Sequence, residues 1–108
     1  MSGCMQVMTT VSSREEGDRL AGILVEQRLA ACVQVVGPIS STYRWEGEVQ
    51  VAEEWQCQIK TRAEIFNVLK ESIRKHHSYD TPEIVAMPIA LGSADYLTWI
   101  EKNVTLPH

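Results

Sequence analysis

Residues 31–60 read ACVQVVGPISSTYRWEGEVQVAEEWQCQIK, two long strand-like runs that meet at Glu46-Gly47. Each arm of this hairpin would hold roughly 13 to 15 residues, whereas an ordinary strand has about 5 to 6. Gly37-Pro38 interrupts the first arm, and because proline has no N–H to donate, we expect a bulge or an edge there. A chain of 108 residues is too small to cover such a hairpin. We therefore predict that other copies of the protein pair with its edge strands.

The second arm of the hairpin alternates apolar and polar side chains with a period of two. The pattern predicts one face that packs on the core and one polar face that carries Glu54 and Lys60. The residues expected on the apolar face are Val49, Val51, Trp55, Cys57 and Ile59.

The segment before the hairpin predicts a strand and a helix. Residues 5–11 are short and β-prone, which is typical of a first strand. Ser12-x-x-Glu15 has the form of a capping box, and the helix that follows should run to about Arg28.

The segment after the hairpin predicts a helix, a strand and a second helix. Thr61-x-x-Glu64 is another capping box in front of an amphipathic helix. A core strand over residues 83–91 follows, and Gly92-Ser93 precedes a short last helix. The order is β-α-β-β-α-β with an added C-terminal helix. It predicts a single α+β domain over residues 1–108, with the ferredoxin-like arrangement of a four-stranded antiparallel sheet covered on one face by two helices.

Composition narrows the function classes. The net charge is −4, and ten basic residues are scattered among fourteen acids, so no nucleic-acid partner is expected. No apolar run approaches the ~18 to 20 residues that would span a bilayer, and residues 1–6 do not read as a secretory signal, so we expect a cytoplasmic protein without a membrane partner. The sequence contains no common catalytic motif, which favours a protein that is not an enzyme.

His76-His77 is the first candidate site. Imidazole suits copper, zinc and nickel, and two histidines supply half of a four-coordinate site. Adjacent residues on a helix point about 100° apart, so both rings could face one ion only if the helix ends there. The alternative is that both histidines place positive charge at a helix C-terminus, where it complements the helix dipole.

The second candidate site lies on the hairpin. Glu54 and Lys60 share the polar face of one strand, and Tyr43 and Trp45 lie near them on the other arm. Together with Tyr79, they could form a cleft between subunits for a small polar ligand. The alternative is that they are cross-strand pairs that hold subunits in register.

Five motifs in register resemble the CutA family of divalent-cation-tolerance proteins, over nearly the whole chain. They are Arg28-Leu29-Ala30-Ala31-Cys32-Val33, Tyr43-x-Trp45-x-Gly47, Ile59-Lys60-Thr61, His77-x-Tyr79-x-x-Pro82-Glu83-Ile84 and Tyr96-Leu97-x-Trp99.

The resemblance implies a cytoplasmic homotrimer of ferredoxin-like subunits, similar to the PII-type signalling trimers. It also implies tolerance to divalent metals and direct binding of copper, with zinc as the alternative and no organic cofactor. The family's implicated residues are a histidine pair, which falls on His76 and His77, and a cysteine at the end of the first strand.

This chain departs from the family pattern at two positions. The family cysteine is replaced by Thr9, whose hard oxygen is a poor substitute for a thiolate on Cu(I). Copper bound through His76 and His77 should therefore be held modestly, with a further ligand from a neighbouring subunit. Ser78 stands where a proline is common, which should loosen the turn. A PII-like regulatory trimer that binds a small polar metabolite in the cleft is the alternative function.

Overall fold

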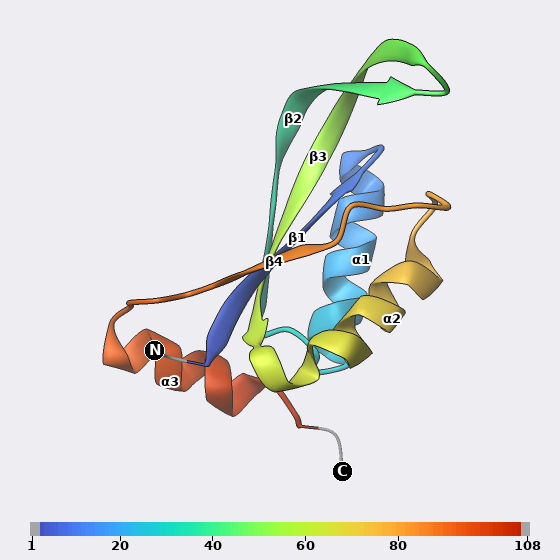
Figure 1. Ribbon diagram of the computed structural model, residues 1–108. Coiled ribbons are helices and arrows are strands. Elements are labelled where there is room, and N and C mark those ends of the chain that lie inside the picture. Colours follow the sequence, from blue (N-terminus) through green and yellow to red (C-terminus); the bar gives the residue numbers. More distant parts are fainter. Residues whose placement is uncertain (1–2, 107–108) are drawn as a thin grey trace.

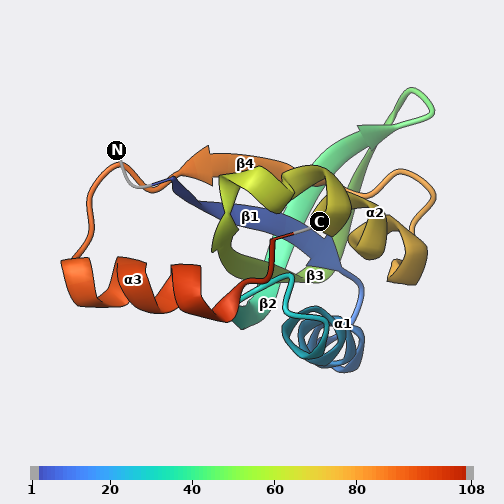
Figure 2. The same ribbon diagram turned by 90° about the horizontal axis from the view of Figure 1, so that it is seen from below.

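A computed structural model describes residues 3–106 as one antiparallel sheet with helices packed against it (Figures 1 and 2). The predicted order, β-α-β-β-α-β followed by a helix, is confirmed. The four strands lie in the order β2-β3-β1-β4. The elements are β1 (Cys4–Val11), α1 (Arg14–Glu26), β2 (Cys32–Trp45), β3 (Glu48–Arg62), a 3-10 turn (Ala63–Ile65), α2 (Phe66–His76), β4 (Val85–Pro88) and α3 (Ala94–Asn103).

Apolar side chains between the sheet and the helices α1 and α2 form the core. In α1, Leu20 and Leu24 are four residues apart and so share one helix face; Leu69 and Ile73 do the same in α2. Burying each such side chain stabilises the fold by about 1.5–3 kcal/mol. The helix α3 lies near the end of the sheet at which β1 begins (Figure 1). The largest fully buried apolar side chains are Val7, Val11, Leu20, Leu24, Ile59, Ile65, Leu69, Ile73 and Ile100.

The long hairpin and its turn are confirmed. Glu46 and Gly47 have φ of 51° and 83°, the pair of positive values that a two-residue type I′ turn requires. The bulge is confirmed as well, because the register of β2 against β3 shifts between Val36 and Ile39. Gly37 lies in this bulge, and a Cβ there would clash with the ring of Trp55. The site therefore requires glycine for lack of space.

The prediction that the apolar face of β3 packs on the core is only partly correct. Cys57 and Ile59 are buried, but Val49 and Val51 are exposed. The reason is that β1 ends at Val11, opposite Trp55, so the hairpin beyond this point has neither a third strand nor a helix against it. Figure 1 shows this outer part projecting past α1.

The first capping prediction is displaced by one residue. Ser13, rather than Ser12, is the N-cap of α1, and its Oγ accepts a hydrogen bond from the Glu16 N–H at 3.1 Å. The helix ends at Glu26 instead of Arg28, which has a positive φ of 59°. Two adjacent serines satisfy the same local pattern, so the sequence did not distinguish them.

The second capping prediction is wrong. Thr61 belongs to β3, is fully buried, and donates its hydroxyl hydrogen to the Leu29 carbonyl at 2.8 Å. The helix α2 begins at Phe66 after a 3-10 turn and has no side-chain cap. The strand predicted over residues 83–91 is also shorter, Val85–Pro88, because it pairs only with Met5–Met8 of β1. In the described part of the chain, no helix has the length and apolar character needed to cross a membrane.

Candidate functional site

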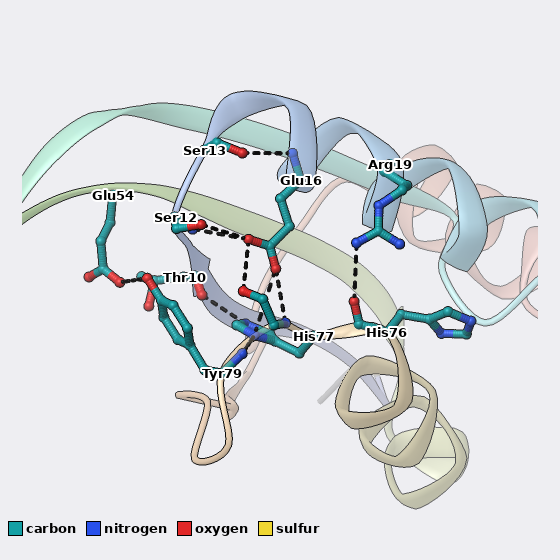
Figure 3. A network of polar contacts seen from close by, with 10 residues as sticks. Thr10, Ser12, Ser13, Glu16, Arg19, Glu54, His76, His77 and Tyr79 are labelled. Atoms are coloured by element: carbon teal, nitrogen blue, oxygen red, sulfur yellow. Dashed lines mark hydrogen bonds and ion pairs between the residues drawn. The ribbon is translucent and has the colours of Figure 1, made fainter.

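The segment after α2 crosses the end of β1 and is held there by His77. The imidazole Nδ1 accepts a hydrogen bond from the Tyr79 N–H at 3.0 Å, so Nε2 carries the ring proton and donates it to the Thr10 carbonyl at 2.8 Å. The side chain of His77 is completely buried. Both ring nitrogens of His77 are therefore engaged in hydrogen bonds within the protomer (Figure 3).

Glu16 ties the same segment to the start of α1. Its Oε1 accepts from the Ser12 hydroxyl at 3.0 Å and the Ser78 hydroxyl at 3.1 Å, and its Oε2 accepts from the Ser78 N–H at 3.1 Å. Burial opposes ionisation of Glu16, but the hydrogen bonds from Ser78 and Ser12 outweigh it and lower the pKa of the carboxyl. Ser78 donates two of these bonds, and a proline at this position could donate neither, so the serine adds contacts that tie the turn to α1.

Tyr79 reaches across to the hairpin. Its hydroxyl donates to Oε2 of Glu54 at 2.7 Å, and Glu54, which periodicity assigned to the polar face of the strand, is only 8% exposed. Burial, and then the hydrogen bond and the charge of Glu54, raise the pKa of Tyr79. The phenol is therefore a proton donor at neutral pH, and the pair links the end of α2 to β3.

A cleft with a volume of about 690 Å³ opens beside this pair, and we call it the hairpin cleft. It contains four of the five predicted cleft residues, Tyr43, Trp45, Glu54 and Tyr79. The fifth, Lys60, lies six residues from Glu54 along β3 and donates a hydrogen bond to Gln34 at 3.0 Å. The cleft is lined by Thr10, Ser41, Thr42, Tyr43, Trp45, Glu54, Tyr79, Asp80, Thr81 and Glu83.

The two candidate metal ligands at the end of α2 point apart (Figure 3). Nδ1 of His76 lies 2.8 Å from the Ser72 carbonyl, one helical turn earlier, and can only donate to it. This bond leaves Nε2 of His76 with a lone pair for a ligand. His77 has adopted extended backbone at the helix end, as the metal hypothesis required, but its ring turns inward to Thr10.

Thr9 and the cysteines do not complete a metal site within the protomer. Thr9 is fully buried opposite Cys57 in the β1–β3 pair. Burial, together with the charges of Glu16 and Asp18, raises the pKa of the Cys57 thiol to about 11, so it is not a thiolate at neutral pH. Over residues 3–106, His, Cys, Asp and Glu side chains form no group of three that could hold an ion.

The Thr9 hydroxyl is buried and has no hydrogen-bond partner among the described residues. We expect Thr9→Val to raise the free energy of unfolding by about 1–2 kcal/mol, because it replaces this hydroxyl with a methyl group of similar shape. Denaturation by guanidinium measures the change.

Thr61→Val is the matched control for Thr9→Val. Thr61 is equally buried, but its hydroxyl donates to the Leu29 carbonyl, so its loss should destabilise the protein. Equal destabilisation by both substitutions would show that the Thr9 hydroxyl has a partner in the assembled protein.

Sequence reasoning missed Glu16, Ser78 and the Thr10 carbonyl. Glu16 had a detectable signal, since Ser13-x-x-Glu16 is a capping box of the same form as the one assigned one residue earlier. The contacts of Ser78 and Thr10 depend on segments more than 60 residues apart and have no local signal.

Comparison with known proteins identifies the family. A family model described as CutA1 divalent ion tolerance protein matches residues 5–103. The divalent-cation tolerance protein CutA of Thermus thermophilus is 46% identical over 90% of this chain and 94% of its own length. The chloroplastic CutA proteins of Oryza sativa and Arabidopsis thaliana are 43% and 44% identical, and the chain spans 55% and 53% of their lengths.

Solved structures agree with this result. The crystal structure of CutA from Xylella fastidiosa has a TM-score of 0.93 at 32% identity and covers 95% of this chain and 99% of its own. The Thermus thermophilus protein has a TM-score of 0.92 at 44% identity, covering 94% and 99%. The family model and the Thermus thermophilus protein are named for divalent-ion tolerance, and neither carries an enzyme name. The chain belongs to the CutA1 divalent ion tolerance family.

Proposed function

We propose that this protein acts in the response to divalent cations as a cytoplasmic homotrimer that binds the ion directly and is not an enzyme. Copper is the first candidate ion and zinc the second. Membership in a family named for divalent-cation tolerance supports the general role. The location is a proposal for this chain alone, since relatives are named chloroplastic in Oryza sativa and periplasmic in Archaeoglobus fulgidus.

The observation that carries direct binding is the orientation of His76. Its Nε2 has a lone pair for an ion, because Nδ1 is committed to the Ser72 carbonyl. His77 ligates only if it gives up its bond to Thr10 or to Tyr79, which lowers the net affinity. One protomer thus offers one ready ligand, so we propose modest affinity and a further ligand from a neighbouring subunit.

The outer hairpin supports self-association. It exposes Val49 and Val51 on the face opposite to Tyr43 and Trp45, and neither a helix nor a third strand covers these two valines in the protomer. Apolar side chains gathered on one exposed element are typical of an interface. Edge strands of this length also need a partner, and a second copy supplies one.

Calorimetric titration of Cu(II) and Zn(II) into the native assembly tests the metal hypothesis. We expect saturable binding at about one ion per subunit, and a loss of affinity of about tenfold or more in His76→Ala, because the substitution removes the ready ligand. Affinity should also fall as the pH is lowered from about 7.5 to about 5.5, since a protonated imidazole cannot ligate.

Lys75→Ala is the control, because Lys75 precedes His76 at the same helix end and is exposed. It should leave the titration unchanged. Binding that survives His76→Ala, or that is insensitive to pH, would exclude ligation at the end of α2.

The hairpin cleft favours a second candidate function, a PII-like trimer that regulates a partner by binding a small polar metabolite. A volume of about 690 Å³ suits a small molecule, and polar and aromatic side chains converge on it. Lys60 lies outside the cleft, so the predicted residues that remain to contact the ligand are Tyr43, Trp45, Glu54 and Tyr79.

A further inference from the structure

The hairpin cleft has an unusual combination of charge and aromatic surface. Three carboxylates line it, those of Glu54, Asp80 and Glu83, and none of the described lining residues is Lys, Arg or His. Three aromatic rings, of Tyr43, Trp45 and Tyr79, line it as well. A negative potential in a partly enclosed cleft concentrates cations and excludes anions.

Glu54 is the central charge of the cleft. It is 8% exposed, and its Oε2 accepts one hydrogen bond, from the Tyr79 hydroxyl at 2.7 Å. Among residues 3–106 no Lys, Arg or His forms an ion pair with it. A buried carboxylate is normally matched by a cation, and a neutral phenol does not supply one. The missing positive charge can come from a ligand, because Glu54 lines the cleft.

The side chains around Glu54 favour an organic cation over a metal ion. Over the described chain no three His, Cys, Asp or Glu side chains lie close enough together to coordinate one ion. Aromatic faces bind ammonium groups through the ring quadrupole, and Trp and Tyr do so best. Tyr43 and Trp45 line the cleft from β2, and Tyr79 lines it from the segment after α2.

We propose that the hairpin cleft binds a small organic cation, a quaternary ammonium or protonated amine, with its charge at the Glu54 carboxylate and its apolar part against the aromatic rings that line the cleft. This assignment rests on the second candidate function and specifies the chemical class of its ligand. The Tyr79 hydroxyl holds the Glu54 carboxylate in place, and Asp80 and Glu83 add negative charge at the rim.

Calorimetry or ligand-observed NMR on the native assembly, at low salt with a metal chelator present, tests the assignment. The probes are choline, putrescine, the neutral choline isostere 3,3-dimethylbutan-1-ol, and glutarate as an anion. We expect saturable binding of a cationic probe and at least about tenfold weaker binding of the neutral isostere and of glutarate, because the carboxylate and the rings both select positive charge.

Two variants locate the site. Glu54→Gln removes the charge but keeps an oxygen that can accept from Tyr79, and it should weaken binding of the cationic probe about tenfold. Glu53→Gln is the matched control, since Glu53 is the exposed neighbour and does not line the cleft, and it should change nothing.

The outcomes separate this inference from the function on which it rests. Saturable binding of the alcohol or of glutarate at least as tight as that of choline and putrescine would overturn the cation class and keep the cleft as a ligand site. Binding of a cation that Glu54→Gln leaves unchanged would overturn the assignment to Glu54. Failure of all four probes to bind would overturn both proposals.

Discussion

Replacing Val49 and Val51 together by lysine is expected to convert the assembly into a folded protomer of 12.2 kDa. The two side chains are 61% and 68% exposed and lie on the same face of β3. Burying each valine against another subunit contributes about 1.5–3 kcal/mol, and a buried lysine without a partner costs more than this gain. Because both positions lie outside the core, the fold of the protomer should be retained.

Light scattering after gel filtration gives the mass, and circular dichroism checks the fold. The wild-type protein should have a mass of three protomers. Val25→Lys with Val68→Lys is the matched control, since both valines are 43% exposed but lie on α1 and α2, away from the hairpin. The control should stay trimeric. A wild-type mass of one protomer, or an unchanged mass in the hairpin variant, would contradict the proposed interface.

His77→Ala is expected to lower the free energy of unfolding by about 2–4 kcal/mol, from two lost hydrogen bonds and a cavity. The imidazole is fully buried and joins the Thr10 carbonyl to the Tyr79 N–H, so its loss leaves both backbone groups without their partner. Guanidinium denaturation measures this change. A chelator removes the contribution of metal binding, and one fixed protein concentration keeps the contribution of subunit association constant.

The neighbouring histidine is the control for this prediction. His76→Ala removes one hydrogen bond on a partly exposed helix end and should cost less than about 1 kcal/mol. The two variants thus separate the roles of the pair, with His77 acting on stability and His76 on metal affinity. Equal destabilisation by both substitutions would show that the structural role is shared.

Local sequence signals predicted most of the fold. Alternating side chains over two long runs and a Glu-Gly pair between them specified the hairpin and its turn, because a type I′ turn needs two residues that accept positive φ. The bulge followed from Gly37-Pro38. The helix start at Ser13 was missed by one residue, since neighbouring serines are locally equivalent and only the reach of Glu16 to Ser12 and Ser78 separates them.

The candidate site was predicted less completely, because its contacts join distant segments. Glu54 was assigned to a polar strand face by periodicity, yet Tyr79, 25 residues later, covers it. Lys60 was grouped with Glu54 because both have the same side-chain direction. Six residues at about 3.3 Å each place them roughly 20 Å apart along the strand, and Lys60 does not line the cleft that contains Glu54.

The sequence by itself determined the order of the elements, the length and turn of the hairpin, and the residue types available for metal or ligand binding. These features depend on backbone preferences and on periodicity, which act over a few residues. Only the tertiary structure decided that His77 is enclosed, that His76 keeps a lone pair for a ligand, and that Glu54 lies in an aromatic, acidic cleft. The physical reason is that a side chain's hydrogen-bond partners and exposure depend on what the rest of the chain packs against it, and no local pattern carries that information.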